Sequence, residues 1–362
     1  MRIGILGTRG IPNFYGGFEQ FAQYLSEGLV KAGHDVFVYN SHLHPHKEKS
    51  WNGVNLVHCY DPEEKIGTAG QFIYDLNCIL DSRKRDLDII LQLGYTSSSV
   101  WNWLFPKNVP IITNMDGLEW KRSKYRKPVQ SFLKFAEKLA VLFSDQLIAD
   151  SKGIQLYLKE KYNKDSVYIP YGANVFSFPD ESVLKNYSLT PYKYDMLIAR
   201  LEPENSVEEI LDGFAASTVK RDFLVIGNTQ TPLGKKLVDK YQDSRIKFVG
   251  YVKGIENLDS LRYFSNLYFH GHSVGGTNPS LLEAMASNAF ICAHDNIFNK
   301  AILEDDAVYF SSAEEVRSLV ESILKKKAGK SILSNIEKVS KIYAWETIIS
   351  QYEVILKDNL KK

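Results

Sequence analysis

The segment from Gly271 to Met285 places glycines, small polar residues and one carboxylate directly after an apolar run, Leu267–Phe269. This run is typical of a strand, and Pro279 fits the first turn of a following helix. Unpaired amides at such a helix start, together with the helix dipole, favour a bound phosphate. Residues of this segment that we expect to contact a nucleotide are Gly275, Gly276, Thr277, Asn278 and Ser280, with Glu283 accepting hydrogen bonds from a ribose. The pattern predicts a nucleotide site, and an ordinary capped turn is the alternative.

His270 and His272 stand just before these glycines, close enough to reach a phosphate or a sugar. Two histidines spaced by two lie on one face of a strand, an arrangement that a metal site would also use. We favour a ligand contact by His272 over metal ligation. The run 86–88 has a D-x-D spacing, but it precedes its strand at a charged helix end and is expected to be solvated. The sequence therefore predicts no required metal.

A second glycine-rich stretch, from Gly7 to Glu19, follows the first apolar run of the chain. Gly16 and Gly17 come directly before a helical pattern, where the absence of a Cβ lets a ligand approach the backbone. The spacing matches neither the G-x-G-x-x-G motif of dinucleotide-binding folds nor a P-loop. A nicotinamide cofactor or an ATPase mechanism is thus poorly supported, and we predict no cofactor. A flexible surface loop is the alternative interpretation.

Short β-rich runs alternate with amphipathic stretches along the chain, as expected for elements that position such loops. Expected strands are 2–6, 36–39, 54–58, 89–93 and 111–114, then 195–199, 223–227, 246–249, 267–269 and 289–293. This alternation predicts parallel α/β sheets in two domains, and the apolar stripe from Trp345 to Ile355 predicts a final helix. Because binding loops gather at the carboxyl ends of parallel strands, a shared cleft and two substrates are expected.

Composition supports two domains and limits the partners. The chain has 362 residues, more than one hydrophobic core usually serves. With 44 Lys and Arg against 43 Asp and Glu, the net charge of +1 argues against bulk nucleic-acid binding. Met1 opens a short strand rather than a signal peptide, and no apolar stretch suits a membrane span. The three scattered cysteines fit neither disulfides nor zinc, which suits a reducing cytoplasm.

Several motifs resemble those of the retaining glycosyltransferases of family four, and most closely its bacterial rhamnosyltransferase branch. They occur in order and span nearly the whole chain: 8–12 with 16–19, 114–122, 149–151, 199–205 and 275–285. The resemblance implies the GT-B fold, in which two Rossmann-like α/β domains face each other across a cleft. Residues 1–172 would form the acceptor-side domain and 173–343 the domain that binds the nucleotide sugar. A final helix, 344–362, would cross back to the first domain.

The resemblance also implies roles for single residues. Arg200, just after a strand, would grip the diphosphate with its planar guanidinium, and Tyr251 would lie near the base. Asp116 would lie beside the acceptor hydroxyl and the anomeric carbon. There it would orient or deprotonate the acceptor, or it would stabilise positive charge on the sugar ring in the transition state. Glu19 and Glu119 are alternative carboxylates on the acceptor side. For Asp116, a turn-forming aspartate before a glycine is the structural alternative.

Two positions depart from the wider family. Asn205 stands where that family carries a lysine, and Gly275 stands where it carries a glutamate, whereas the rhamnosyltransferase branch resembles this sequence at both. We interpret the departures as a changed donor pocket, with Arg9 or the pair Lys235 and Lys236 supplying charge for the phosphates. A degenerate, inactive copy is the other interpretation.

The resemblance points to dTDP-L-rhamnose as the nucleotide-sugar co-substrate. It also points to a lipid-diphosphate-linked saccharide as the acceptor, in the synthesis of a bacterial surface polysaccharide. The basic, aromatic segment 120–127, followed by apolar residues at 132, 135, 139 and 142, would hold the enzyme on the anionic inner face of the membrane. A solvated rim above a core helix is the alternative. Alternative functions are transfer from another donor such as UDP-glucose or a UDP-N-acetylhexosamine, sugar-nucleotide epimerisation, and nucleotide binding without catalysis.

Overall fold

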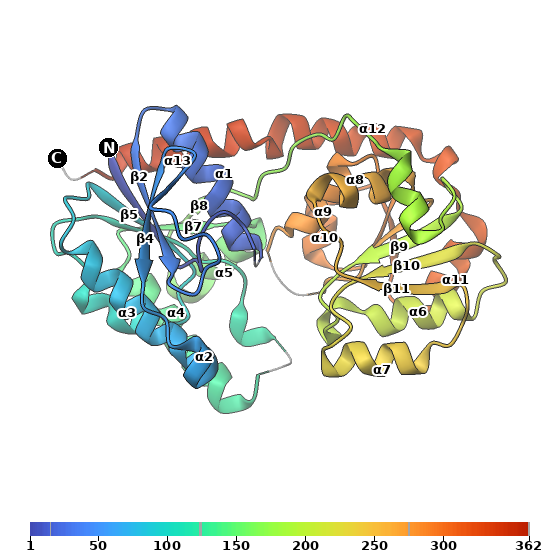
Figure 1. The fold of residues 1–362 in the computed structure, drawn as a ribbon, viewed down its shortest axis with the longest axis horizontal. Coiled ribbons are helices and arrows are strands. Elements are labelled where there is room, and N and C mark those ends of the chain that lie inside the picture. The colour runs from blue at the N-terminus through green and yellow to red at the C-terminus, as the bar shows by residue number, and fades with distance from the viewer. Residues whose placement is uncertain (15, 123–124, 274–275, 361–362) are drawn as a thin grey trace. The chain divides into compact units, whose positions relative to one another are not determined.

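The computed structural model describes residues 1–14, 16–122, 125–273 and 276–360, and it divides into two compact units. Unit 1 comprises Met1–Tyr171 together with Trp345–Lys362, and unit 2 comprises Gly172–Ala344 (Figure 1). Each unit contains one sheet with helices on both faces. The expected α/β class with two parallel-sheet domains is therefore confirmed.

The sheet of unit 1 has the strand order β3-β4-β2-β1-β5-β6-β7-β8. Neighbouring strands pair in parallel, except that β3 runs antiparallel to β4. The strands are β1 (Arg2–Leu6), β2 (Asp35–Ser41), β3 (Ser50–Trp51), β4 (Val54–Cys59), β5 (Ile89–Leu93), β6 (Ile111–Asn114), β7 (Gln146–Ala149) and β8 (Val167–Tyr168). The central strands are apolar on both faces, as helices on both sides require.

Helices α1 and α13 cover one face of this sheet, and α3 and α4 cover the other (Figure 1). The helices are α1 (Gly17–Lys31), α2 (Glu63–Ile66), α3 (Gly70–Ser82), α4 (Lys127–Phe143), α5 (Lys152–Tyr162) and α13 (Trp345–Asp358), with short 3-10 turns η1 (Gly67–Ala69), η2 (Ser99–Leu104) and η3 (Glu119–Lys121). Trp345 stacks on Tyr24 of α1 at 4.6 Å between ring centroids, and Tyr352 lies 5.1 Å from the ring of Phe21. The last helix of the chain is therefore part of the unit 1 core.

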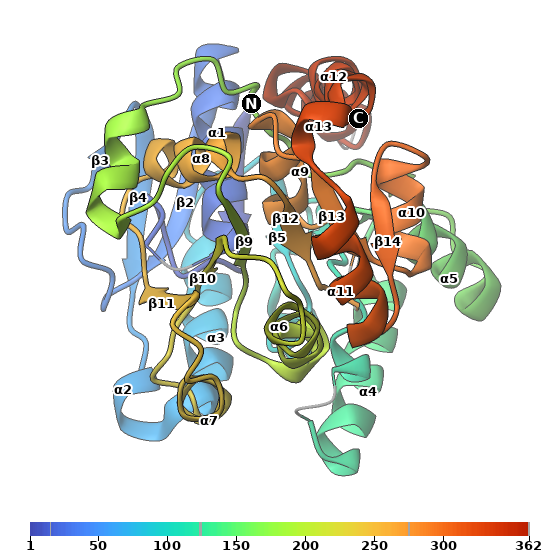
Figure 2. The same ribbon diagram turned by 90° about the vertical axis from the view of Figure 1, so that its right-hand side faces the viewer.

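Unit 2 has a fully parallel sheet of order β11-β10-β9-β12-β13-β14. The strands are β9 (Tyr194–Ile198), β10 (Asp222–Ile226), β11 (Ile246–Gly250), β12 (Tyr268–His270), β13 (Ile291–His294) and β14 (Val308–Phe310). The helices are α6 (Val207–Ala215), α7 (Pro232–Lys240), α8 (Ile255–Phe264), α9 (Pro279–Ala286), α10 (Ile297–Leu303), α11 (Ala313–Ser322) and α12 (Gly329–Lys338), with turns η4 (Glu181–Tyr187), η5 (Pro203–Asn205), η6 (Lys325–Lys327) and the π turn η7 (Val339–Tyr343). Helices α6 and α11 pack side by side on one face (Figure 2).

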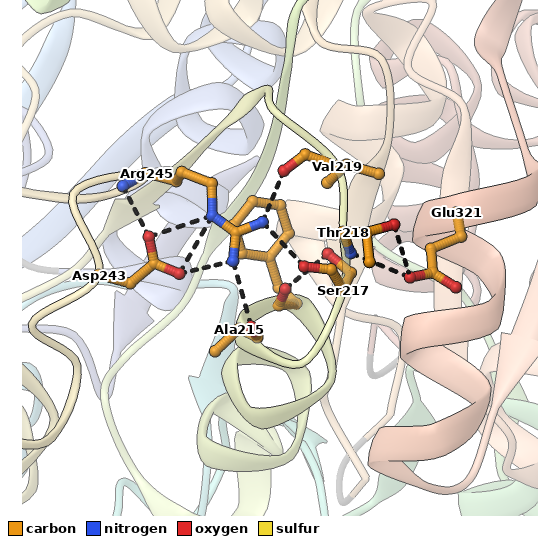
Figure 3. Close-up of polar contacts among 8 residues, drawn as sticks. Ala215, Ser217, Thr218, Val219, Asp243, Arg245 and Glu321 are labelled. Carbon is orange, nitrogen blue, oxygen red and sulfur yellow. Dashed lines mark hydrogen bonds and ion pairs between the residues drawn. The ribbon is translucent and has the colours of Figure 1, made fainter.

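A single arginine holds the loop after α6. The guanidinium of Arg245 donates to the carbonyl oxygens of Ala215 (3.1 Å), Ser217 (3.0 Å) and Val219 (2.6 Å), and it pairs with Asp243 at 2.6 Å (Figure 3). The carbonyls at a helix C-terminus lack partners within the helix, and a cation there also complements the helix dipole. Arg245 is thus a structural residue at the end of α6 opposite to the loop that carries Arg200.

Helix α4 turns a different face to the core than its apolar spacing predicts. Phe135 is 54% exposed and Leu142 is 62% exposed, whereas Glu137 is buried. The Glu137 carboxylate accepts hydrogen bonds from Tyr157 (2.7 Å), Tyr162 (2.6 Å) and Trp120 (3.0 Å). These donors compensate the burial of a charge, so the idea of a core helix built on residues 132, 135, 139 and 142 is wrong for 135 and 142.

Candidate functional site

The start of α9 is a capped helix N-terminus, as its sequence predicts. The Asn278 side-chain oxygen accepts a hydrogen bond from the Ser280 amide at 2.9 Å, and Pro279 occupies the first turn. The Ser280 hydroxyl lies 2.8 Å from the hydroxyl of Tyr268 on β12. A phosphate at this amide would thus have to replace the Asn278 side chain. Thr277 is buried beside this turn, and Gly275 lies outside the described residues.

The loop between β12 and α9 is joined to the loop between β9 and α6. The amide and the hydroxyl of Ser273 both donate to the Glu204 carbonyl, at 3.0 and 2.8 Å. A Cβ on Gly271 would overlap the carbonyl oxygen of Asn205, so this close approach requires glycine. Arg200 is exposed at the start of the second loop. Unit 2 therefore brings Arg200 and the segment before α9 to the same carboxyl edge of its sheet.

Asn205 has a structural role in this loop. It is buried, and its side-chain amide donates to the Arg200 carbonyl at 2.7 Å. This hydrogen bond closes the turn that begins at Arg200, and an asparagine makes it without adding a charge. Two other expected cations already have carboxylate partners, because Lys236 lies 3.4 Å from Glu208, and Arg9 in unit 1 pairs with Glu63 at 2.6 Å. Lys235 is exposed on α7.

Glu283 is held by a buried cation that the sequence analysis did not identify. Its Oε2 accepts a hydrogen bond from Nη2 of Arg262 at 2.6 Å, and Nη1 of Arg262 donates to Asp259 at the same distance. Burial raises the pKa of Asp259, while the charge of Arg262 opposes that change. Both partners of this arginine come from neighbouring helices, α8 and α9. The one sequence signal for Arg262 is its position between the apolar residues Leu261 and Phe264 on a short helix.

The two histidines stack on each other at the end of β12. Their ring centroids are 4.4 Å apart, and the rings are inclined by 15°. Burial, reinforced by His272 and Arg262, lowers the pKa of His270 well below its ordinary value, so its imidazole is neutral. The His272 carbonyl accepts hydrogen bonds from Asn296 (3.0 Å) and Asn299 (3.1 Å), which fixes the chain beside the glycines. Within the described ranges, no group of three or more His, Cys, Asp and Glu side chains could hold a metal ion.

Glu19 holds the glycine-rich loop of unit 1. Its carboxylate accepts a hydrogen bond from the Arg9 amide at 2.9 Å and lies 3.5 Å from the Thr8 hydroxyl. Gly16 forms the N-cap of α1, Gly17 begins the helix, and the Gly16 amide donates to Asn13 at 3.2 Å. The loop is therefore tied down at several points, in contrast to the alternative of a flexible surface loop.

Asp116 sits in a tight turn at the carboxyl end of β6. Its φ of 52° lies in the left-handed region, which aspartate tolerates better than most residues. Its amide donates to the side-chain oxygen of Asn114 at 2.9 Å. Glu119 pairs with Arg122 at 2.6 Å, so that carboxylate is neutralised locally. The left-handed φ also fits a turn-forming aspartate before a glycine, and seven other described non-glycine residues have a positive φ, so the acceptor role of Asp116 stays a prediction.

The buried Tyr171 of unit 1 interacts electrostatically with three carboxylates. Burial raises the Tyr171 pKa well above its ordinary value, and the charges of Asp116, Asp150 and Glu19 raise it further. Two of the three, Asp116 and Glu19, were predicted as site residues. Asp150 directly follows β7 and is fully buried, and it belongs to the motif 149–151, to which the sequence analysis gave no role.

In the basic segment 120–127, Lys121, Arg126 and Lys127 are exposed and Arg122 is half-buried, and residues 123 and 124 lie outside the described ranges. Lys121, Lys134 and Lys161 surround the Trp120 ring, with their ammonium groups 5.5, 4.4 and 5.5 Å from its centre. Tyr251, predicted near a nucleotide base, directly follows β11 and is 83% exposed. Among the described helices, none has the length and apolar character to span a bilayer.

Comparisons with known proteins identify the fold. A family described as a domain of unknown function (DUF1972) matches residues 1–174, and no curated protein matches the chain. Sucrose-phosphate synthase from Thermosynechococcus elongatus is 17% identical with a TM-score of 0.79, over 99% of this chain and 98% of that one. HepE from Anabaena, in complex with UDP and glucose, is 14% identical with a TM-score of 0.77, over 99% and 100%. A glycosyltransferase from Rickettsia africae is 13% identical with a TM-score of 0.72, over 100% and 98%.

These solved structures are GT-B glycosyltransferases, so the expected GT-B fold of this chain is confirmed. Identities below 20% relate the folds and leave the chemistry to the site residues. Membership of family four and of its rhamnosyltransferase branch stays a prediction, as do the assigned site residues. HepE is known in complexes with UDP and glucose, with UDP, and with UDP-glucose.

Proposed function

We propose that the protein is a retaining, metal-independent glycosyltransferase that takes its sugar from a nucleoside-diphosphate donor. The observation that carries this proposal is the hydrogen bonding of two loops at one sheet edge of unit 2, through Ser273 and Glu204. The exposed Arg200 begins one of these loops and the capped N-terminus of α9 follows the other, and both features suit a diphosphate. The GT-B fold and the UDP complexes of HepE support the same interpretation.

The chemistry follows from these groups. The bond between the anomeric carbon and the phosphate oxygen breaks, and the acceptor oxygen bonds to that carbon on the same face. The acceptor proton passes to the departing phosphate, so no protein nucleophile is required. Arg200 and the amides of Gly276, Thr277 and Asn278, with that of Ser280 once it releases the Asn278 side chain, would stabilise the charge that develops on the diphosphate. Asp116 would orient the acceptor hydroxyl or stabilise positive charge on the sugar ring.

For the donor we propose dTDP-L-rhamnose, on the strength of the motif resemblance. The test incubates the protein with dTDP-rhamnose, UDP-glucose or UDP-N-acetylglucosamine and membrane-extracted lipid acceptors, and follows the mass of the lipid. A gain of one deoxyhexose from dTDP-rhamnose alone supports both the reaction and the donor. Gain from another donor discards rhamnose and keeps the transferase, and release of an epimerised donor without acceptor identifies an epimerase.

For the acceptor we propose a lipid-linked saccharide, reached from the anionic inner face of the membrane. To segment 120–127 we add the exposed face of α4 as a supporting surface. This face carries Phe135, Leu142 and Phe143 together with Lys134 and Lys138. Apolar side chains flanked by lysines are the composition of a helix that lies in a membrane interface.

A nucleotide-binding subunit without catalysis is the second candidate. It is favoured by Asn205, which stands in place of a cation and is occupied in holding the Arg200 loop. Such a protein would bind a nucleoside diphosphate but would release no free diphosphate from any donor in the presence of acceptors. Turnover in the mass assay excludes this candidate.

A further inference from the structure

Arg262 is among the largest fully buried side chains of the protein, with an exposed fraction of 1%. Its guanidinium joins two carboxylates on different helices, Asp259 on α8 and Glu283 on α9, each at 2.6 Å. The guanidinium carbon also lies 5.9 Å from the ring centre of Tyr268 on β12. One cation thus connects both helices to the central part of the sheet.

A buried arginine needs such partners, because removing a charge from water carries a large free-energy penalty. The planar guanidinium group of arginine donates hydrogen bonds to two acceptors in fixed directions, whereas the ammonium group of lysine does not fix these directions. The hydroxyl oxygen of Ser287 completes the cluster, lying 2.8 Å from the Asp259 carboxylate and 2.6 Å from the Glu283 carbonyl oxygen, so its one proton is shared between these two acceptors. The orientation of the Glu283 carboxylate is therefore set by Arg262, through bonds that also fix the backbone one turn later.

We infer that Arg262 is a positioning residue of the donor site, which holds the Glu283 carboxylate in the orientation that accepts the ribose hydroxyls. The inference rests on the proposed function, in which Glu283 binds the ribose of the nucleotide. Arg262 itself is enclosed by protein, so it acts through Glu283 and not on the ligand. Asp259 accepts the hydrogen bond of Nη1, the other terminal nitrogen of the guanidinium, and keeps Arg262 in place.

The test compares the affinities of paired nucleotides that differ only in ribose hydroxyls. Calorimetry measures dTDP against its 3′-deoxy analogue, and UDP against 2′,3′-dideoxy-UDP. Hydrogen bonds to a charged group correspond to an affinity ratio of about tenfold or more, so the wild-type protein is expected to prefer the hydroxylated nucleotides by that factor. Glu283→Gln and Arg262→Lys are both expected to reduce this ratio several-fold, mainly by weakening the hydroxylated member of each pair.

Arg245→Lys is the matched control. Arg245 also pairs with a carboxylate in unit 2, in a partly buried position, and holds several carbonyls, but it lies at the far end of α6 (Figure 3). This variant is expected to unfold at a lower temperature while it keeps the wild-type ratio. A general loss of packing would weaken both members of a nucleotide pair equally, so the ratio separates positioning from stability.

Arg262 variants that leave two buried carboxylates unpaired can fail to fold. The double variant Arg262→Gln/Glu283→Gln removes one of those charges, and it is expected to have the same nucleotide ratio as Glu283→Gln alone. Two results overturn this inference but leave the proposed function standing. One is a further drop of the ratio in the double variant, and the other is a wild-type ratio in Arg262→Lys while Glu283→Gln has a reduced ratio. A wild-type protein that binds neither nucleotide overturns the proposed function and this inference with it.

Discussion

The side-chain amide of Asn114 donates a hydrogen bond of 2.8 Å to the hydroxyl of Tyr352. The two residues are far apart in the sequence, and both are buried. The carbonyl oxygen of the same Asn114 side chain accepts from the Asp116 amide, so one amide group connects the last helix to the turn that carries the candidate acceptor carboxylate. Burial raises the Tyr352 pKa far above its ordinary value, so its hydroxyl keeps its proton.

This connection predicts that Tyr352→Phe lowers the free energy of unfolding by about 1 kcal/mol, the net value of one buried hydrogen bond. The Asn114 side chain would be free to rotate, and the Asp116 turn would lose part of its support. We expect sugar transfer to fall more than donor affinity does. Tyr309→Phe, which removes a hydroxyl bonded to the Glu304 carbonyl in unit 2, is the control and should leave transfer unchanged. Equal activities of Tyr352→Phe and wild type would contradict the link.

Asp116→Asn tests the carboxylate itself. Asparagine tolerates the left-handed φ of 52° and keeps the turn, so the change removes charge without altering the backbone. If Asp116 acts on the acceptor or on the reacting carbon, the rate constant kcat should fall by about 100-fold or more, with a nearly unchanged KM for the donor. Steady-state kinetics with saturating acceptor measure both constants. A KM that rises with unchanged kcat would assign Asp116 to binding instead.

Asp75 predicts a pH dependence of stability in unit 1. Burial raises its pKa to about 7, opposed by the hydrogen bond from Ser97 at 2.6 Å. The folded state therefore retains a proton between the unfolded pKa near 3.8 and about 7, and the free energy of unfolding falls as the pH rises through that window. Asp75→Asn can accept the same hydrogen bond and does not titrate. It should be more stable than wild type at pH 8, by at most about 4 kcal/mol, and nearly equal at pH 4. Denaturant unfolding at the two pH values decides this.

The exposed face of α4 predicts membrane binding that depends on its apolar side chains. Phe135→Ser/Leu142→Ser should reduce co-sedimentation with anionic vesicles several-fold, because burying each side chain contributes about 1.5–3 kcal/mol. Phe178→Ser is the control, since Phe178 is 88% exposed but belongs to unit 2. Vesicles without anionic lipid should bind less wild-type protein. Equal loss in the control variant, or binding that ignores lipid charge, would reject the α4 surface.

The sequence predicts secondary structure where apolar patterns are long. It does not predict contacts between residues that are far apart in the chain. Apolar runs such as Arg2–Leu6 and Ile89–Leu93 match strands at both ends. The strands β3, β7, β8 and β14 were not predicted, because runs of two to four residues carry little periodic signal. The apolar spacing of α4 points outward because the buried Glu137 finds its donors on other elements.

The same limit applies to the site. Glu283 follows from its distance to a helix start, which is a local property of the chain. Its partner Arg262 lies 21 positions earlier on another helix, and the pairing depends on how α8 and α9 rotate against each other. Asp116, Asp150 and Glu19 all act on the pKa of Tyr171, an effect that depends on how the elements of unit 1 pack and not on local sequence. Local signals therefore suggest residues that would bind ligand, whereas partners such as Arg262 follow only from the fold.

Gly271→Ala tests whether the two loops of unit 2 form one site. A Cβ at this position would overlap the Asn205 carbonyl oxygen, which is backbone and cannot rotate away. The β12–α9 loop would have to move from the β9–α6 loop, and this would strain the hydrogen bonds from Ser273 to Glu204. We expect nucleotide affinity to fall at least tenfold, together with a loss of stability of about 1–3 kcal/mol from overpacking.

Gly329→Ala is the matched control for that change, because Gly329 begins α12 and a Cβ there would meet no atom within 4 Å. It should leave nucleotide affinity unchanged and stability equal or slightly higher, since alanine is the better helix former. Calorimetric titration with UDP or dTDP measures affinity for both variants, and thermal unfolding measures stability. If Gly271→Ala loses stability but keeps its affinity, the joined loops support the fold alone, and the nucleotide must bind elsewhere on the unit 2 sheet.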